Sequence, residues 1–349
     1  MRDDVRVLVL GTGHMGSGIA RLLLDKRGVA LVGAFARRAE RAGMDVGAAI
    51  GLGRDLGLPV GVDLAALIER ARPDVAIQAT CSRISDAMAE LTTLVRHGVH
   101  VISIAEEMAY PACSSPAFAD ELHWLAVARG VTVLGTGVNP GFVLDLLVVT
   151  LSAVCADVES VTATRVNDLS PYGRTVLASQ GVGLSPQAFA QGVKEGTVVG
   201  HVGFPESIHL IAAALGWDIE RIAQTREPIV ATVRRVTPVV SVEPGQVAGC
   251  HHSAVAYRDG KPVITLIHPQ QVHPHLEGVQ TGDRIEIRGT PPVCFSGSPE
   301  IPGGQATVAL AVNMVPRVMN APPGLHSMLD LPVPAALLGD ARRLVRERA

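Results

Sequence analysis

The sequence predicts an α/β protein with a doubly wound parallel sheet, followed by an α+β domain on a mostly antiparallel sheet. Three observations predict this fold class. An apolar run, Val5–Leu10, leads directly into a G-x-G-x-x-G motif at residues 11–16. Strand and helix patterns then alternate over the first third of the chain, which is typical of parallel βαβ units. Beyond Asn139 the pattern changes to alternating runs separated by turn signals, which favours antiparallel pairing.

The glycine motif matches the dinucleotide-binding fingerprint in its required context, between a strand and a helix. Gly11 allows the tight turn, Gly13 lets the backbone approach a pyrophosphate, and Gly16 lets the helix pack close to the strand. The helix N-terminus supplies free N–H groups and a positive dipole end for the phosphates. The residues expected to contact the cofactor here are Gly11, Thr12, Gly13, His14, Met15 and Gly16. We therefore predict a Rossmann domain that binds a nicotinamide dinucleotide.

The other elements of the first domain are predicted from apolar runs of strand length and periodic stretches of helix length. The expected strands are Val5–Leu10, Val29–Phe35, 74–79, His100–Ser103 and 131–134, with 60–62 as a further short candidate. The helical stretches between them include 64–70 and Ile84–Arg96. Strands that alternate with helices in this way form right-handed crossovers, so the sheet should be parallel.

The second domain is predicted to begin with a helix at 142–155. The expected strands are 160–166, 229–242, 254–257, 263–268 and 284–287, interrupted by a helix at 205–216. A last helical pattern, 305–318, is expected to pack back on the first domain. We expect a dinucleotide-binding domain at 1–138, a substrate and dimerisation domain at 139–303, and a C-terminal helix and tail at 304–349.

Composition and charge argue against several classes of function. The net charge of −3 gives no support for nucleic-acid or anionic-membrane binding. The most apolar window, 142–156, contains Asp145 and is too short to cross a bilayer. Five scattered cysteines without a C-x-x-C pair, and a start without a signal-peptide pattern, favour reduced thiols in a cytoplasmic protein. The histidines show no metal-ligand spacing, so no metal is expected, and the C-H-H run at 250–252 is expected to lie in a sheet.

The residues that follow Val29–Phe35 bear on the choice of nucleotide. In NAD-preferring versions of this fold an acidic residue at this point binds the ribose 2′-hydroxyl. Here no acid ends the strand, and Arg37 and Arg38 follow it. Guanidinium groups suit a 2′-phosphate by charge and by bidentate geometry. The alternative is a solvated arginine pair on a surface loop. The sequence favours NADP as the preferred cofactor, with NAD as a second cofactor that the enzyme can use.

Two more stretches follow predicted strands, at the edge where ligands of open α/β sheets bind. Thr80 and Cys81 follow the strand at 74–79 and are expected to contact the cofactor. Glu106 and Glu107 follow His100–Ser103. A partly buried carboxylate beside a cofactor can have the raised pKa that proton transfer needs. The alternative is that both glutamates only complement the dipole of a helical first turn.

Several stretches resemble the family of 2,4-diaminopentanoate dehydrogenases, relatives of dihydrodipicolinate reductase and of the NAD(P)-dependent native amine dehydrogenases. They are G-T-G-V-N-P-G-F at 135–142, R-V-N-D-L-S-P-Y-G at 165–173, G-H-V-G-F-P-E-S-I at 200–208, H-P-Q-Q at 268–271, P-E-I-P-G-G at 299–304, V-N-M-V-P at 312–316 and N-A-P-P-G-L at 320–325. Together they are spread from residue 135 to residue 325, so the resemblance extends well beyond the dinucleotide-binding domain. Within the sixth stretch, Asn313 is expected to contact the cofactor.

The resemblance implies roles for individual residues. A glutamate after the fifth strand, counting 60–62 as a strand, is the catalytic carboxylate of that family. Glu106 is its best match, and Glu107 is the alternative and an expected substrate contact. Asn139 matches a residue that lines the substrate pocket and would bind the polar group at the reacting carbon. Tyr172 and His201 are expected to bind the rest of the substrate, with satisfied core or interface roles as the alternative.

The resemblance also implies a reaction: oxidative deamination of 2,4-diaminopentanoate or a similar amine to a ketone and ammonia, reversible as reductive amination. Hydride would leave the amine-bearing carbon for the nicotinamide, and water would add to the iminium with Glu106 as general base. Another NADP-dependent imine or carbonyl reductase is one alternative. A nucleotide-binding sensor without catalytic activity is the other. The resemblance further implies a homodimer that pairs through the second domain.

Overall fold

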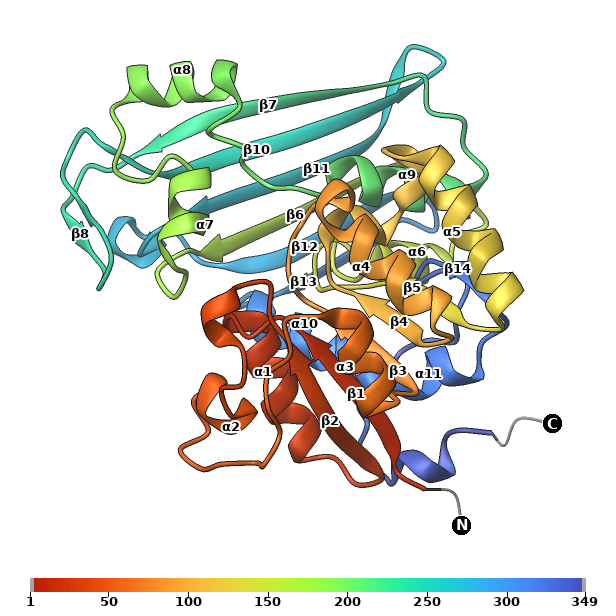
Figure 1. Cartoon of the computed structure of the whole chain (residues 1–349). Coiled ribbons are helices and arrows are strands. Elements are labelled where there is room, and N and C mark those ends of the chain that lie inside the picture. The colour runs from red at the N-terminus through yellow and green to blue at the C-terminus, as the bar shows by residue number, and fades with distance from the viewer. Residues whose placement is uncertain (1–2, 347–349) are drawn as a thin grey trace. The chain divides into compact units, whose positions relative to one another are not determined.

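The computed structural model describes residues 3–346 and divides into two compact units. Unit 1 contains the described residues up to Phe142 and those from Pro302 onward. Unit 2 contains Val143–Ile301. The chain therefore leaves unit 1, builds all of unit 2, and returns to unit 1 (Figure 1). No helix in the described part of the chain combines the length and apolar character needed to span a bilayer.

Unit 1 is built on a six-stranded sheet in the order β14-β5-β4-β3-β1-β2, in which every neighbouring pair is parallel. The strands are β1 (Val5–Leu10), β2 (Val29–Phe35), β3 (Val75–Gln78), β4 (His100–Ser103), β5 (Thr132–Gly135) and β14 (Gly324–His326). The sheet reverses its order at β1 and β3, as a doubly wound fold requires. The predicted Rossmann-like fold is confirmed.

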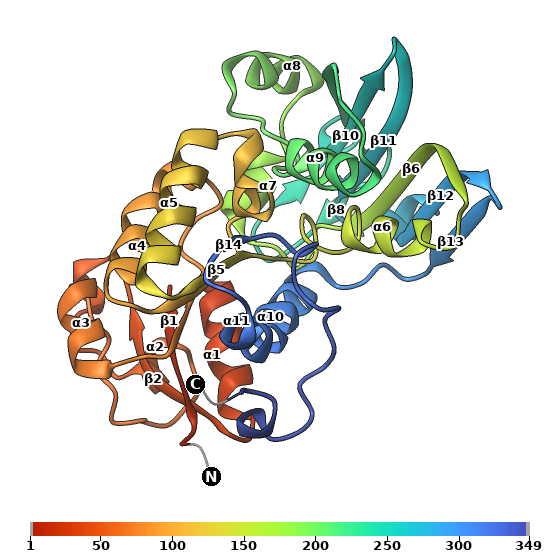
Figure 2. The ribbon, with the colours of Figure 1, turned by 90° about the vertical axis from the view of Figure 1, so that its right-hand side faces the viewer.

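Helices cover both faces of this sheet, which is why its central strands are almost wholly apolar and buried. One face carries α1 (His14–Leu24), α10 (Gly303–Asn313) and α11 (Val315–Asn320), and the other carries α3 (Leu64–Ala71), α4 (Ile84–Arg96) and α5 (Pro116–Arg129) (Figure 2). Shorter helical segments are α2 (Val46–Ala49), η1 (Ala39–Arg41), η2 (Glu106–Ala109), η3 (Pro111–Cys113) and η5 (Ala341–Arg343). Helix α10, which falls in the last helical pattern of the sequence, belongs to unit 1 and packs against α1.

Three details of unit 1 differ from the sequence prediction. The candidate strand at 60–62 forms only an isolated bridge between Gly61 and Phe35. The single helix expected at 305–318 is broken at Met314, because Pro316 cannot donate a backbone hydrogen bond within a continuous helix. Strand β14 has only three residues, too few for a pattern to reveal.

Unit 2 is built on a second six-stranded sheet in the order β13-β12-β6-β11-β10-β7. Its strands are β6 (Asp157–Asp168), β7 (Arg221–Val230), β10 (Val247–Arg258), β11 (Lys261–Gln271), β12 (Gly282–Thr290) and β13 (Val293–Gly297). Only the β6–β11 pair is parallel, and the other neighbouring pairs are antiparallel. The predicted mostly antiparallel sheet is confirmed, and the run 250–252 lies within β10 as expected.

The helices of unit 2 are α6 (Leu146–Ser152), α7 (Arg174–Ser179), α8 (Pro186–Glu195) and α9 (Phe204–Leu215), with the short η4 (Pro274–Glu277). The helix expected at 142–155 is shorter, because Asp145 accepts a hydrogen bond from Leu146 N and caps it there. The strand expected at 229–242 is also wrong. β7 ends at Val230, and only the small ribbon of β8 (Arg235–Val236) and β9 (Ser241–Val242) follows, around Pro238, which has no N–H for a ladder.

Candidate active site

The fingerprint turn after β1 fits a dinucleotide by its local geometry. Gly11 has φ +108°, and a Cβ there would lie 2.6 Å from Ala79 O. A Cβ at Gly16 would lie 1.9 Å from Gly11 O, so packing demands both glycines. A Cβ at Gly13, the N-cap of α1, would meet no atom from elsewhere in the described residues within 4 Å, so there is room there for close approach of a ligand. Helix α1 begins at His14 without a side-chain cap, so its first N–H groups suit a phosphate.

The other candidate residues of unit 1 follow the carboxyl ends of neighbouring strands, so the topology gathers them at one edge of the sheet. Thr80 and Cys81 follow β3, Glu106 follows β4, and Asn139 follows β5. The turn and its neighbours are held together, because Gly11 N donates to Phe35 O at 2.8 Å and Thr80 lies against Gly11. This edge is the candidate active site of unit 1.

Glu106 and Glu107 are adjacent but differ in their partners. The Glu107 Oε2 atom accepts a hydrogen bond from Ile84 N at 2.8 Å and so caps α4 from outside the helix. Burial raises the pKa of Glu106, and the charge of Glu107 adds to that rise. Hydrogen bonds from its own backbone N–H and from the Ser82 side chain act in the opposite direction. Glu107 therefore has a structural task, whereas Glu106 has the environment of a proton-transfer group.

A close backbone approach positions the turn that carries Glu106. A Cβ at Gly135 would lie 1.7 Å from Met108 O, so only glycine lets η2 pack on the end of β5. Thr136 N donates to Ser103 O at 2.9 Å and joins the ends of β4 and β5. Farther along, Val138 N donates to Thr307 Oγ1 at 3.1 Å, which anchors the loop that leads to Asn139.

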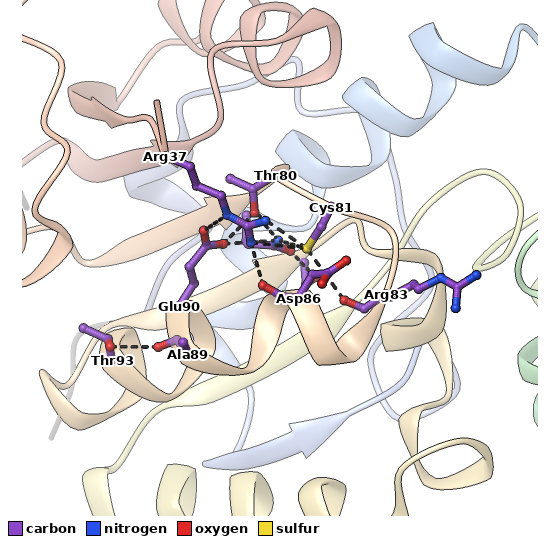
Figure 3. A network of polar contacts seen from close by, with 10 residues as sticks. Arg37, Thr80, Cys81, Arg83, Asp86, Ala89, Glu90 and Thr93 are labelled. Carbon is purple, nitrogen blue, oxygen red and sulfur yellow. Dashed lines mark hydrogen bonds and ion pairs between the residues drawn. The ribbon is translucent and has the colours of Figure 1, made fainter. Parts of the chain in front are cut away.

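The two arginines after β2 have different surroundings. Arg38 is exposed. Arg37 Nε lies 2.6 Å from Glu90 Oε1, and its Nη2 donates to Asp86 O at 2.6 Å (Figure 3). Glu90, on α4, is a residue of this edge that the sequence prediction missed. An acidic residue on the otherwise apolar buried face of an amphipathic helix was the signal that could have revealed it.

Asn313 stands apart from the fingerprint. Its Oδ1 accepts a hydrogen bond from Leu337 N at 2.8 Å, so it supports the C-terminal segment. The opposite end of α10 lies beside the fingerprint helix, since a Cβ at Gly304 would be 3.8 Å from His14 and 3.9 Å from Met15. The geometry gives Asn313 a structural partner and adds no support to its predicted cofactor contact.

Unit 2 contains a buried polar layer on one face of its sheet. The layer consists of Arg165, Asn167, His252, His268, Gln270 and Asp283. Pairing of the strands brings its members together: His252 faces His268 across β10 and β11, and Arg165 faces Asp283 across β6 and β12. Arg165 Nη1 lies 2.6 Å from Asp283 Oδ1, which compensates both buried charges.

His201 lies beside this layer, with its ring 4.9 Å from that of His268 between centroids. Its backbone N–H donates to His252 Nδ1 at 3.0 Å, and its buried Nε2 has no hydrogen-bond partner among the residues that the structure describes. Burial lowers the pKa of His201 and of His252 to about 3, so both rings are neutral. Tyr172 is half-buried and packs against a separate apolar cluster of unit 2 that includes Leu169.

One group of side chains has the proximity of a metal site: Asp168, His273 and His275. Protein partners already occupy both ring nitrogens of His273 and one oxygen of Asp168. His273 Nδ1 contacts Ser170 Oγ at 3.0 Å, and its Nε2 contacts Val236 O at 2.8 Å. Asp168 Oδ1 accepts from Ser170 N at 2.8 Å. The absence of a metal stays a prediction.

Comparison with known families agrees with this geometry. Residues 142–347 match the 2,4-diaminopentanoate dehydrogenase C-terminal domain, and residues 5–104 match the dihydrodipicolinate reductase N-terminus. The chain is 44% identical to a 2,4-diaminopentanoate dehydrogenase of Acetoanaerobium sticklandii, covering 99% of both chains. It is 24% identical to an amine dehydrogenase of Streptomyces virginiae, covering 95% of this chain and 98% of that one.

A solved structure is also similar to this chain. The amine dehydrogenase from Mycobacterium smegmatis superposes with a TM-score of 0.85 at 28% identity, covering 96% of this chain and 98% of that one. The fingerprint, the fold and these relatives define an NAD(P)-dependent amine dehydrogenase. More narrowly, the chain belongs to the 2,4-diaminopentanoate dehydrogenase family.

Proposed function

We propose that this enzyme oxidatively deaminates 2,4-diaminopentanoate, or an amine close to it, to a ketone and ammonia. The name of the Acetoanaerobium sticklandii relative supports this substrate. The observation that carries the proposal is the position of Glu106, which follows β4 at the same sheet edge as the fingerprint turn and has a pKa raised by burial. A carboxylate of this kind can take a proton near neutral pH. The reverse reaction is reductive amination.

The residues of unit 1 would divide the chemistry as follows. The fingerprint turn at residues 11–16 would hold the dinucleotide, whose nicotinamide would supply the acceptor for a hydride from the amine-bearing carbon. Glu106 removes a proton from the water that adds to the resulting iminium, and ammonia then leaves the carbinolamine. Asn139 hydrogen-bonds the polar group at the reacting carbon, while Glu107 keeps Glu106 in place by capping α4. In reductive amination Glu106 orients the incoming ammonia.

Unit 2 would bind the remainder of the substrate. His201 supports this role because its buried Nε2 has no hydrogen-bond partner within residues 3–346, and its pKa of about 3 keeps the ring neutral. A neutral imidazole can donate to or accept from a polar substrate group. Tyr172 is the second residue that we assign to substrate binding in this unit.

We further propose NADP as the preferred cofactor, with NAD also used. No acidic residue ends β2, and Arg37 and Arg38 follow it. Replacing both arginines with alanine should raise the KM for NADP far more than the KM for NAD, because only NADP has the 2′-phosphate. Equal changes in both constants would contradict this preference.

The direct test of the reaction is an assay of 2,4-diaminopentanoate with each cofactor, followed by measurement of ammonia release. In the reverse direction, NADPH oxidation in the presence of the ketone should require ammonia. Oxidation that proceeds equally well without ammonia would favour a carbonyl reductase instead. Binding of cofactor with no turnover of any amine would favour a nucleotide-binding sensor.

We also propose a homodimer and a reducing, cytoplasmic environment. The mixed sheet of unit 2 has two edge strands, β7 and β13, and such edges are commonly covered by a partner. All five cysteines are free, which suits a compartment that keeps thiols reduced. Sedimentation at micromolar concentration should show two chains per particle, and a monomer would contradict the dimer.

A further inference from the structure

Glu90 is a buried acidic residue to which the proposed reaction gives no role. It lies on α4, and its side chain is only 8% exposed. It shares the buried face of that helix with Ala87, Leu91 and Leu94. A carboxylate in such surroundings needs partners that compensate its charge, because burying an unpaired charge is very unfavourable. The hydrogen-bond and ion-pair partners of Glu90 therefore indicate its role.

One oxygen of Glu90 holds Arg37. The distance from Oε1 to Arg37 Nε is 2.6 Å, and the pair is completed by the bond from Arg37 Nη2 to Asp86 O (Figure 3). The Arg37 side chain is still 40% exposed. The Arg37 guanidinium is thus partly exposed after the end of β2, and the buried Glu90 carboxylate compensates its positive charge.

The other oxygen of Glu90 holds the residues at the end of β3. Oε2 accepts a hydrogen bond from Thr80 Oγ1 at 2.5 Å and a longer one from Gln78 Nε2 at 3.4 Å. Gln78 Oε1 in turn accepts from Ser103 Oγ, at the end of β4, at 2.6 Å. Glu90 therefore contacts two side chains that are expected to bind the cofactor. Its Oε1 atom binds Arg37, which follows β2, and its Oε2 atom binds Thr80, which follows β3.

We propose that Glu90 sets the cofactor selectivity of this enzyme: its carboxylate neutralises Arg37 and thereby weakens the preference for NADP over NAD. The inference rests on the proposed function, in which Arg37 and Arg38 face the ribose 2′ position. A guanidinium paired with a carboxylate offers a 2′-phosphate little net attraction, whereas the exposed Arg38 keeps its full charge. Arg37 still presents N–H donors, so a 2′-hydroxyl is also accepted.

Glu90→Gln is the central test. Glutamine keeps a carbonyl oxygen for Arg37 Nε and removes the negative charge. We expect the ratio of kcat/KM for NADP to kcat/KM for NAD to rise about tenfold, mainly through a lower KM for NADP. The rise should shrink as salt is added. General damage to the fold would lower kcat/KM for both cofactors together and could not raise the ratio. An unchanged or lower ratio would overturn the proposal.

Two companion variants sharpen this test. Glu69→Gln makes the same charge change at an exposed position on α3 and should leave the ratio as it is. In an Arg37→Gln background, Glu90→Gln should no longer raise the ratio, because the charge that it releases is absent. A rise that persists without Arg37 would contradict the proposed mechanism.

A last pair of variants separates folding and cofactor preference from the role of Glu90. If Glu90→Gln does not fold, Glu90→Met removes the charge with a side chain of similar length, and the same rise is expected. Failure of both to fold would assign the carboxylate to stability and overturn the proposal. Arg38→Ala in the native background tests the NADP preference itself. Loss of selectivity there, with no effect of Glu90→Gln, would leave the proposed function standing and refute this inference alone.

Discussion

The two units bury their polar groups in different ways. In unit 1 the strands are apolar along most of their length, and polar side chains such as Gln78 and Ser103 stand at the carboxyl ends. In unit 2 the buried polar groups lie within one sheet face: along β6 the buried residues Val161 and Ala163 are followed by Arg165 and Asn167. In a doubly wound sheet the carboxyl ends of the strands meet at one edge, so the strand order decides where polar side chains gather. In an antiparallel sheet the register of the strands decides which polar side chains face one another.

The largest expected effect tests the edge of unit 1. Glu106→Gln should lower the chemical rate by ~10²–10⁴, the usual range for a positioned acid or base, while cofactor binding stays within a few fold. Single-turnover kinetics with the bound amine would measure this rate.

Glu107→Gln is the matched control, because its amide oxygen can still accept from Ile84 N and cap α4. It should keep most of the activity. Near-normal turnover of Glu106→Gln, with loss of activity in Glu107→Gln, would transfer the catalytic role to Glu107.

The next effect tests the face of unit 2. Asp283→Ala leaves Arg165 buried without its partner and should destabilise the protein by about 3–5 kcal/mol, as removal of one member of a buried ion pair does. Urea denaturation would measure it. Glu286→Ala, which breaks an exposed pair with Arg284 on the same strand, should hardly move the midpoint. Similar midpoints for both variants would show that the buried layer contributes little to stability.

A smaller effect is expected on substrate binding. His201→Leu should raise the KM for the amine about tenfold and leave the KM for either cofactor unchanged, since it removes one hydrogen bond to a polar ligand group. His275→Ala, an exposed histidine of the same unit, should change neither constant. An equal rise in the amine and cofactor constants would instead point to general damage.

The smallest expected effect concerns the pH dependence of kcat/KM for deamination. As a general base Glu106 acts only when ionised, so kcat/KM for deamination should rise with pH through its pKa, which burial places above the ordinary value of 4.5. His201 and His252, with pKa values of about 3, stay neutral over this range and should add no step near 6.5. An acidic limb that survives unchanged in Glu106→Gln would belong to another group.

What could be predicted from the sequence follows the same division. Strand ends can be read from apolar runs, so the sequence predicts the fingerprint, Arg37, Thr80 and Glu106 as parts of one sheet edge. Glu90 was missed because its role depends on a partner 53 residues away in the chain. The neighbours of Arg165 could not be found either, since Asp283 meets it only through the pairing of β12 with β6. Register of that kind depends on tertiary packing rather than on local pattern.

The parallel sheet of unit 1 also constrains the order in which the chain can mature. Its edge strand β14, and the helices α10 and α11 that cover one face, come from residues made after all of unit 2. On the ribosome, residues up to Phe142 emerge with the edge of β5 unpaired and with only α1 available for the face that α10 and α11 later cover. The hydrogen bonds from Thr132 Oγ1 to Pro322 O and from Leu325 N to His123 Nδ1 can form only after all of unit 2 has been made. The nucleotide-binding unit is thus begun before unit 2 and completed after it.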